Sequence, residues 1–378
     1  MIEILVDILW VLIGSYSLFT IGLLFLWRSI PKNKIKSTAT STTISVIIPV
    51  RNEAANILHL LRDLEGQSLP YHQFEVIIVD DSSTDNTAEL VNTFRAGSSC
   101  RIHLLPLTDT FTESPKKRAI ESAIHIATGE LIVTTDGDCR VGPGWLEAIA
   151  TCYEQTSARL ISGPVTFTAE TSLTDHLQTV EFSSLIGSGA CTIAAGKPTM
   201  CNGANLTYTR EVFFDVDGFE GTRHVASGDD EFLLHKISSR YPDQIQFLKH
   251  PEAIVQTGPH RQWMQFYRQR KRWASKWKHY KSKSPVILAL YVFSCNAALL
   301  VAPILAVSGF ITFTTLLAML LLKWIPEWLY IGRVLLFLKK KRSIPYIPLV
   351  QLIYPFYVTF FGLAVQRPEY EWKGRKLV

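Results

Sequence analysis

The apolar positions of the chain predict a membrane anchor at its N-terminus. Residues 4–27 are apolar apart from Asp7. At about 1.5 Å per residue, a helix of this length crosses a hydrocarbon core of about 30 Å. The stretch is too long for the apolar part of a signal peptide and lacks a small-residue cleavage site, so we expect an anchor that is not removed.

Further apolar stretches lie near the C-terminus. Residues 285–322 are long enough for two crossings, with interruptions near Pro303 and Gly309, and residues 346–365 form another apolar block. Residues 325–338 lie between them and contain two charged side chains. This segment indicates either a short crossing or a helix that lies in the membrane interface.

The centre of the chain has a different pattern, in which short β-branched runs alternate with helical periodicity. A helix is expected at residues 116–127, and another follows the first strand. Alternation of this kind predicts βαβ units and a mainly parallel sheet. The predicted strands are residues 44–50, 74–79, 102–105 and 130–135.

Acidic side chains follow three of these strands. They belong to Arg51-Asn52-Glu53, to Asp80-Asp81 and to Asp136-Gly137-Asp138. The carboxyl edge of a parallel sheet is where ligands bind in open α/β folds. Mg²⁺ prefers oxygen ligands and is often held by one or two carboxylates together with substrate phosphates, so the Asp-x-Asp pair fits a metal–diphosphate site. No GxGxxG follows the first strand, which argues against a dinucleotide fold.

The net charge of +5 is concentrated beside the apolar segments, which indicates anionic lipid rather than nucleic acid as the partner. The bias of Lys and Arg places the central region and the C-terminal tail in the cytoplasm, and this requires an even number of crossings after the central region. Six scattered cysteines show no metal-ligand spacing and are expected to be reduced. The basic positions are Arg28, Lys32, Lys34, Lys36, residues 268–283, residues 339–342, Lys373, Arg375 and Lys376.

Several motifs in one order resemble the GT-A-fold glycosyltransferases of family 2. The resemblance covers about residues 43–273 and implies a mixed, mainly parallel α/β sheet flanked by helices, joined here to transmembrane helices. The motifs are I-P-V-R-N-E, V-D-D-S-S-T-D, the lysine-bearing helix, D-G-D, N-G-A-N-L, D-G-F, G-D-D-E-F-L and Q-R-K-R-W.

The resemblance implies roles on the donor side of the site. Asp81 would hydrogen-bond the nucleotide base, with Glu53 near the same pocket. Asp138 would bind Mg²⁺ or Mn²⁺, and Asp136 would face the ribose or the metal. Lys116 matches a basic position near the nucleotide, although Lys117 and Arg118 leave the register open and a solvated helix face is the alternative.

The resemblance also implies a general base and an acceptor side. Asp230 is the candidate base because of its register with Leu233, but the family usually has Glu-Asp where this chain has Asp229-Asp230, so the assignment stays open between adjacent acids. An acidic cluster at a helix N-terminus is the alternative. Asn205 and Asp229 are the candidate acceptor contacts, and a glycine-bearing loop is the alternative for Asn205.

Residues 261–283 contain no acid, and aromatic side chains recur there at helical spacing. This pattern predicts a basic amphipathic helix in the interface. Within it, the resemblance assigns Gln269, Arg272 and Trp273 to the donor diphosphate and the acceptor sugar.

We therefore expect a multi-pass enzyme of the cell membrane that inverts configuration and moves a sugar from a nucleotide-sugar, most simply a UDP-sugar, to a lipid or lipid-linked glycan. A processive polysaccharide synthase and a non-enzymatic nucleotide-sugar or lipid-binding protein are the alternatives. The expected parts are an anchor at 1–29, a basic linker at 30–42, a cytoplasmic catalytic domain at 43–260, an interface helix at 261–284 and a membrane region at 285–378 with two to four crossings.

Overall fold

The computed structural model describes residues 2–32, 41–108, 114–276, 280, 283–364, 370–372 and 375–377. The predicted basic residues Lys34, Lys36 and Lys373 lie outside the described residues. The chain forms two compact units. We call them the sheet unit (Ile30–Ala169, Thr192–Pro259 and Glu369–Val378) and the helical unit (Met1–Ser29, Glu170–Cys191 and His260–Pro368).

The sheet unit is built on a seven-stranded mixed sheet in the order β3-β2-β1-β4-β7-β5-β8. β1, β2, β3 and β4 are parallel, as the β-branched runs predicted, and β7 is antiparallel to both of its neighbours. A short parallel pair, β6 with β9, lies beside it. The strands are β1 (Ile44–Val50), β2 (Phe74–Asp81), β3 (Arg101–Leu107), β4 (Leu131–Thr134), β5 (Leu160–Ser162), β6 (Val165–Phe167), β7 (Leu206–Thr209), β8 (Ile245–Phe247) and β9 (Val255–Thr257).

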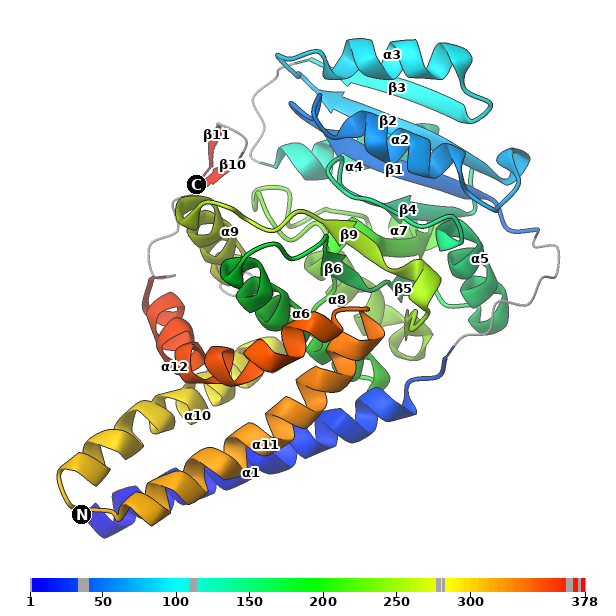
Figure 1. Ribbon diagram of the computed structural model, residues 1–378. Coiled ribbons are helices and arrows are strands. Elements are labelled where there is room, and N and C mark those ends of the chain that lie inside the picture. The colour runs from blue at the N-terminus through cyan, green and yellow to red at the C-terminus, as the bar shows by residue number, and fades with distance from the viewer. Residues whose placement is uncertain are drawn as a thin grey trace. The chain divides into compact units, whose positions relative to one another are not determined.

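Helices cover both faces of this sheet (Figure 1). The chain steps outward from β1 to β3 and then back to β4, so right-handed crossovers place α2 and α3 on one face and α4 on the other. Buried β-branched and leucine side chains fill the central strands, as expected where both faces are covered. The helices are α2 (Ile57–Glu65), α3 (Thr87–Gly97), α4 (Pro115–Ile126), α5 (Trp145–Thr156), α7 (Arg210–Asp215) and α8 (Glu231–Arg240).

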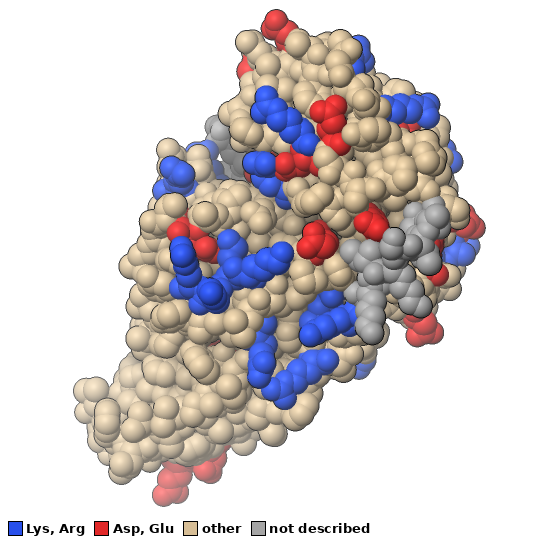
Figure 2. Space-filling model, turned by 45° about the vertical axis from the view of Figure 1, so that its right-hand side comes forward, with Lys and Arg blue, Asp and Glu red and all other residues tan. Residues whose placement is uncertain are grey.

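The helical unit contains long apolar helices. Among the residues that the structure describes, four segments are long and apolar enough to cross a membrane: Ile2–Ser29, Ser284–Val307, Phe313–Phe337 and Lys341–Leu363. The visible surface of these helices is almost free of charge in Figure 2. The helices are α1 (Ile2–Ser29), α6 (Leu173–Ala194, of which the part to Cys191 belongs here), α9 (Trp263–Ser275), α10 (Ser284–Val307), α11 (Phe313–Phe337) and α12 (Ile347–Ala364), which the 3₁₀ turn η6 (Lys341–Tyr346) precedes.

The structure corrects the prediction for residues 325–338. They are not a separate short crossing or interface helix, because α11 runs without a break from Phe313 to Phe337. One of the two charges that suggested a boundary is neutralised inside the unit, because Glu327 pairs with Lys323 at 2.7 Å and both are buried, whereas Arg333 is exposed. The predicted interruption near Gly309 is confirmed, since α10 ends at Val307 and Gly309 has a φ of 75°. The predicted interruption near Pro303 is wrong, because α10 continues through this proline.

The division of the chain also differs from the predicted boundaries. Residues Glu170–Cys191 fall within the predicted catalytic domain, but they group with the membrane-like helices. The end of the chain, Glu369–Val378, groups with the sheet unit, and its strands β10 (Tyr370–Trp372) and β11 (Arg375–Leu377) pair as a hairpin. No marked change in composition borders Glu170–Cys191, whereas the chain does become strongly charged before Glu369.

Candidate active site

The polar ends of the strands meet at one edge of the sheet unit. β1, β2 and β4 are parallel neighbours, so the segments after Val50, Asp81 and Thr134 emerge together. β7 runs the other way, which brings the turn before it, η2 (Gly203–Asn205), to the same edge. Thr134 Oγ1 donates to the carbonyl of Gly203 at 2.8 Å and ties the two segments together.

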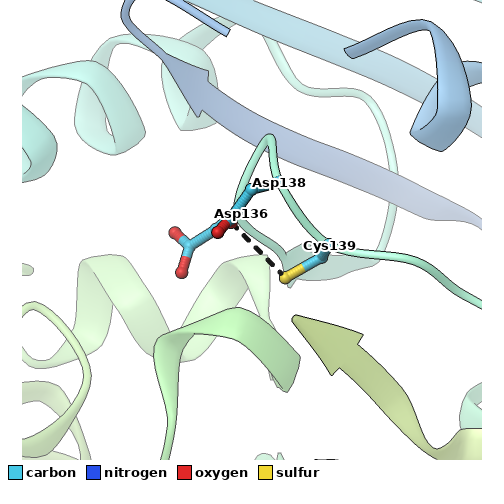
Figure 3. A group of neighbouring side chains, drawn as sticks. All are labelled: Asp136, Asp138 and Cys139. Carbon is cyan, nitrogen blue, oxygen red and sulfur yellow. Dashed lines mark hydrogen bonds between the residues drawn. The ribbon is translucent and has the colours of Figure 1, made fainter. Parts of the chain in front are cut away.

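Asp136 and Asp138 lie on the turn that follows β4 (Figure 3). Asp138 is exposed, and its Oδ2 accepts a hydrogen bond from Thr257 Oγ1 at 3.1 Å. Gly137 between them has no room for a side chain, because a Cβ would lie 2.9 Å from the side chain of Val50. The small middle residue therefore lets the turn pack closely on β1 while both carboxylates remain accessible.

The two carboxylates and Cys139 form a group whose ligand atoms lie within 4.8 Å of one another. Cys139 is buried, and burial together with the two neighbouring carboxylates raises the pKa of its thiol well above the ordinary value. A neutral thiol is a poor ligand for a hard cation. The donor set offered to a metal is therefore the pair of carboxylates, which fits Mg²⁺ or Mn²⁺.

Lys116 lies in the first turn of α4 and connects two of the acidic motifs. Its Nζ is 2.7 Å from Asp136 Oδ1 and 3.3 Å from Asp229 Oδ2. Burial alone would lower the pKa of Lys116, but the carboxylates of Asp136, Asp229 and Asp230 raise it above the ordinary value. The side chain is therefore a permanent cation among these acids.

The neighbours of Lys116 point elsewhere. Lys117 is buried and donates to the carbonyls of Thr222 and Val225 at 2.7 and 2.8 Å. Arg118 donates to Asp81 Oδ1 at 2.7 Å. Of the three consecutive basic residues, the structure thus brings Lys116 to Asp136 and leaves Lys117 with a structural contact.

Asp81 and Glu53 lie on the donor side of the edge. Asp81 ends β2 and is almost fully buried against Arg118. Glu53 is also buried, and its Oε2 accepts a hydrogen bond from Asn56 Nδ2 at 2.8 Å. The sequence identifies Arg118 only as a neighbour of Lys116, because a linear pattern does not show that it forms an ion pair with Asp81.

Asp230 begins α8 and is held from two sides. Its Oδ1 accepts from the backbone N–H of Glu231 at 2.7 Å, which caps the helix, and its Oδ2 accepts from the N–H of Gly203 at 3.0 Å. Both predicted roles of this acid, helix cap and site residue, are compatible with this geometry. The hydrogen bond from Gly203 fixes the carboxylate beside the turn that precedes β7.

Asn205 does not lie in the open part of the site. Its side chain is buried, accepts from Trp145 Nε1 at 3.1 Å and donates to the carbonyls of Pro164 and Ala253 at 2.9 and 2.8 Å. These bonds use the amide fully within the protein core, which argues against the predicted acceptor contact. Asp229, the other predicted acceptor residue, stands beside Lys116 in the site.

Gln269, Arg272 and Trp273 lie on α9, which belongs to the helical unit. The buried side chain in this motif is Arg270, whose Nε donates to Glu181 Oε1 at 3.1 Å. Trp273 lies between the guanidinium of Arg270, 4.4 Å from its ring, and the stacked ring of Phe182 at 6.0 Å. Gln269 Oε1 accepts from Arg270 Nη1. No pattern in the sequence marked Glu181.

A mainly parallel sheet with an acidic edge of this kind is the GT-A fold of nucleotide-sugar transferases. Two family models match the chain: "Glycosyl transferase family 2" over residues 45–215 and "Glycosyl transferase family group 2" over residues 131–359. The second covers more than half of the chain, which therefore belongs to the family 2 group of glycosyltransferases. The predicted resemblance and fold class are confirmed.

Individual relatives match parts of the chain. Glycosyltransferase AglE of Haloferax volcanii is 29% identical over 193 residues, which is 51% of this chain and 60% of that protein. The dodecaprenyl-phosphate galacturonate synthase of Rhizobium johnstonii is 27% identical over 124 residues, 32% of this chain and 36% of that one. The alignments thus span less than two thirds of these relatives.

The fold extends over nearly the whole chain in one solved structure. It is the mannosyltransferase PcManGT of Pyrobaculum calidifontis, in complex with GDP-Man and Mn²⁺. The TM-score is 0.57, with 19% sequence identity, and the match covers 93% of this chain and 99% of that one. At this identity the likeness shows a common fold.

Proposed function

We propose that this glycosyltransferase is membrane-bound and moves a sugar, with inversion, from a nucleotide-sugar to a hydroxyl group of a lipid or lipid-linked glycan at the cytoplasmic face. The observation that carries the proposal is the meeting of Lys116, Asp136, Asp229 and Asp230 at the edge where Asp138 also emerges. A cluster of four acids and one lysine at the ligand-binding edge of a GT-A sheet suits a divalent cation and, through it, a diphosphate donor.

A divalent cation is the expected cofactor, held by Asp138 and Asp136. When bound, such a cation offsets the charge of a diphosphate and of the leaving group, as a Lewis acid. The two carboxylates fit this role because they are accessible and the neighbouring thiol is neutral. Lys116, 2.7 Å from Asp136, adds a second positive charge on the same side.

The bond-forming step needs a base, and Asp230 is placed to supply it. The acceptor oxygen forms the new bond to the anomeric carbon, the bond from that carbon to the diphosphate oxygen breaks, and the acceptor proton passes to the carboxylate. The N–H groups of Gly203 and Glu231 keep this carboxylate in one orientation. A positioned base of this kind contributes about 10²–10⁴-fold.

The donor pocket is proposed to use Asp81 and Glu53 for the nucleotide. Arg118 holds the carboxylate of Asp81 and so fixes its direction. Gln269, Arg272 and Trp273 are proposed to reach the diphosphate and the acceptor sugar. The cation–π contact of Arg270 with Trp273 supports this by giving the tryptophan ring a defined orientation.

A lipid acceptor is supported by features of different kinds. The apolar helices supply a membrane location, and α9 adds basic and aromatic side chains typical of an interfacial helix. One relative is named for a polyprenyl phosphate, dodecaprenyl-phosphate. The basic residues beside the apolar helices favour a cytoplasmic position for the sheet unit.

A second candidate is a processive polysaccharide synthase. The Gln-x-x-Arg-Trp pattern at residues 269–273 favours it, since this chain resembles such synthases in that pattern. Product length separates the two candidates. One added sugar per acceptor supports the transferase, and a polymer grown on a single acceptor supports the synthase.

The proposal is tested by thermal unfolding of the intact protein with UDP, GDP and other nucleoside diphosphates, with and without Mn²⁺. A ligand at 100 times its Kd stabilises the folded state by about 2.7 kcal/mol, so metal-dependent stabilisation by UDP is expected. Asp138→Asn should abolish it, whereas Asp243→Asn, an exposed acid on the 3₁₀ turn after α8, should not.

Two outcomes would contradict the proposal at different levels. Stabilisation by GDP and not by UDP would overturn the UDP assignment but keep the enzyme class. No stabilisation by any nucleoside diphosphate, with or without the metal, would contradict the proposed donor site.

A further inference from the structure

Whether α12 crosses the membrane or turns back within it depends on its contacts, and either case rests on the membrane location proposed above. Length and composition alone allow α1, α10, α11 and the segment Lys341–Leu363 to cross a membrane. If all four crossed, three crossings would follow the sheet unit's last connection to α9. The C-terminal tail would then lie on the opposite side from the sheet unit.

Chain connectivity identifies which helices stay on the side of the sheet unit. The chain enters the helical unit at Glu170 and returns to the sheet unit at Thr192, so α6 begins and ends on that side. α9 follows directly after the chain leaves the sheet unit at Pro259. α6 and α9 therefore serve as markers of the near side of the membrane.

The start of α12 lies at this near side. Lys340 pairs with Glu170 at 3.0 Å, and both side chains are buried. Ser343 Oγ lies 2.9 Å from His176 Nδ1, and Tyr346 stacks on the His176 ring with centroids 4.3 Å apart. The turn between α11 and α12 is thus fixed to the first part of α6.

The end of α12 returns to the same two markers. Tyr357 donates to Glu181 Oε1 on α6 at 3.0 Å. The ring of Phe361 lies 6.4 Å from Phe266 and 5.7 Å from Tyr267, both on α9. A straight helix from Ser343 would carry Phe361 about 27 Å away along its axis, which is close to the full thickness of the hydrocarbon core.

The middle of α12 supplies the change of direction. Gln351 reaches inward and donates to the carbonyl of Trp324 at 2.8 Å, in the middle of α11. Pro355 follows four residues later inside the helix, where it removes an N–H donor and kinks the backbone. Figure 1 shows α12 changing direction along its length.

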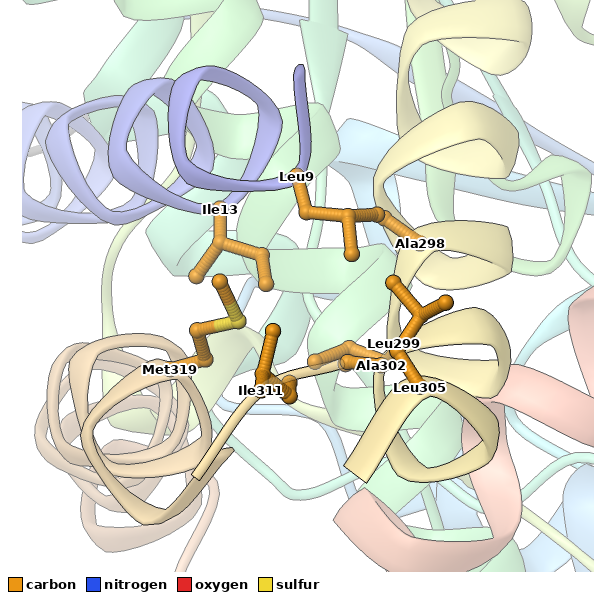
Figure 4. Packing of buried hydrophobic residues seen from close by; sticks show 8 residues of the cluster. All are labelled: Leu9, Ile13, Ala298, Leu299, Ala302, Leu305, Ile311 and Met319. Carbon is orange, nitrogen blue, oxygen red and sulfur yellow. The ribbon is translucent and has the colours of Figure 1, made fainter. Parts of the chain in front are cut away.

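The far half of the helical unit contains no part of α12 among the described residues. Its apolar core is made by α1, α10 and α11 (Figure 4). The buried members are Leu9, Ile13, Ala298, Leu299, Ala302, Leu305, Ile311 and Met319. A fourth crossing helix would be expected to contribute to this cluster.

We propose that α12 is a re-entrant helix. It enters the leaflet on the side of the sheet unit, bends at Pro355 and leaves on the same side, so that only α1, α10 and α11 cross. The membership of the C-terminal hairpin in the sheet unit supports this, because the chain that follows α12 then belongs to the side of the sheet unit.

The outer face of α12 contacts the acyl chains of that leaflet. Its exposed apolar side chains recur at spacings of three and four, which places them on one stripe. The opposite face carries the contacts of Gln351, Tyr357 and Phe361. The exposed stripe consists of Leu349, Leu352, Ile353, Phe356, Phe360 and Leu363.

The test compares epitope tags in the full chain, expressed in cells and detected before and after permeabilisation. One tag is inserted after Gly97, at an open turn of the sheet unit, and one is appended after Val378. The reference tags stand before Met1 and after Ser308, in the turn between α10 and α11. The Gly97 and Val378 tags should be detected under the same condition, and the Met1 and Ser308 tags under the other.

The proposal fails if the Val378 tag is detected together with the Met1 tag and apart from the Gly97 tag. Because the tags are compared with one another, the test of α12 holds whichever side of the membrane the sheet unit occupies. If the sheet unit is not cytoplasmic, the Gly97 tag is detected without permeabilisation, and this result contradicts the proposed function and not the proposal for α12. If the Ser308 insertion prevents folding, the Met1 tag gives the same reference without an internal insertion.

Discussion

At the scale of single residues, Asp230 combines a structural and a chemical role. It caps α8 and accepts from Gly203, so its substitution has to preserve the first role in order to test the second. Asparagine is about as good a helix cap as aspartate, although its one side-chain oxygen cannot also accept from Gly203, whereas alanine loses both hydrogen bonds and costs about 1 kcal/mol as a cap. The asparagine variant is therefore the informative one.

We predict that Asp230→Asn lowers kcat about 10²–10⁴-fold with a hydroxyl acceptor, because the amide cannot accept the proton. Stabilisation by nucleotide and metal should be unchanged. Glu231→Gln, the next acid on α8, is the matched control. A small effect of Asp230→Asn would indicate an acceptor that attacks through a phosphate oxygen, because such an oxygen is already ionised and needs no base. A large effect of Asp229→Asn in its place would assign the role of general base to Asp229.

Lys116 leads to a prediction about binding. Its ammonium group contacts Asp136 and Asp229, and a charged hydrogen bond contributes about 1.5–3 kcal/mol, so Lys116→Met should weaken nucleotide binding about 10- to 100-fold. Calorimetric titration measures this, with the exposed Lys197→Met as control. Unchanged affinity would contradict a donor role.

The pH dependence of Lys116 follows from the direction of its shift. The pKa in the folded protein is raised, so the stabilising charge is fully present below the ordinary pKa of about 10.4 and is lost only as the pH rises through the higher folded value. Between pH 6 and 9, a change in activity should therefore arise from other groups.

At the scale of elements, α11 contains a buried ion pair, which is costly in an apolar helix. Lys323 pairs with Glu327, and Glu327 also accepts from Tyr16 of α1 at 2.8 Å and from Gln351 of α12 at 3.2 Å. One carboxylate thus joins three helices. Charges inside apolar helices are costly unless they are paired in this way.

We predict that Glu327→Gln or Lys323→Met lowers the unfolding midpoint in detergent by more than about 5 °C, since breaking a buried pair costs about 3–5 kcal/mol. The double variant should be less affected than the sum of the two. Lys339→Met, an exposed lysine after the same helix, is the control. Additive losses would show that the pair is not coupled.

The elements also show what the sequence could predict. The four predicted strands lie within two residues of β1 to β4. For β1, β2 and β4 the reason is that apolar runs buried on both faces give a strong local signal, whereas β3 is a partly exposed edge strand. Residues 325–338 were misinterpreted because Glu327 and Arg333 suggested an interface, and a linear pattern does not show that Lys323 lies one turn away to neutralise the acid. Asn205 was misplaced for a similar reason, since its partners Trp145, Pro164 and Ala253 are distant in sequence.

At the scale of the whole molecule, the family could be predicted from the order of motifs, and the domain boundaries could not. Residues Glu170–Cys191 join the helical unit although they lie between two segments of the sheet unit. Their helix has no charge run or proline at its borders that would announce the change. Three apolar segments follow the sheet unit, which conflicts with a basic tail on the same side as that unit, and the proposed return of α12 would remove the conflict.

The reversed strand β7 has a consequence for how such an enzyme can diversify. Because β7 is antiparallel, the turn before it reaches the same edge from outside the segments that follow β1, β2 and β4, and Gly203 ties it to Asp230 and Thr134. The segment preceding Cys201 can therefore change without altering the register of β1, β2 and β4. Under the proposed function, acceptor preference is then expected to evolve separately from the nucleotide and metal site.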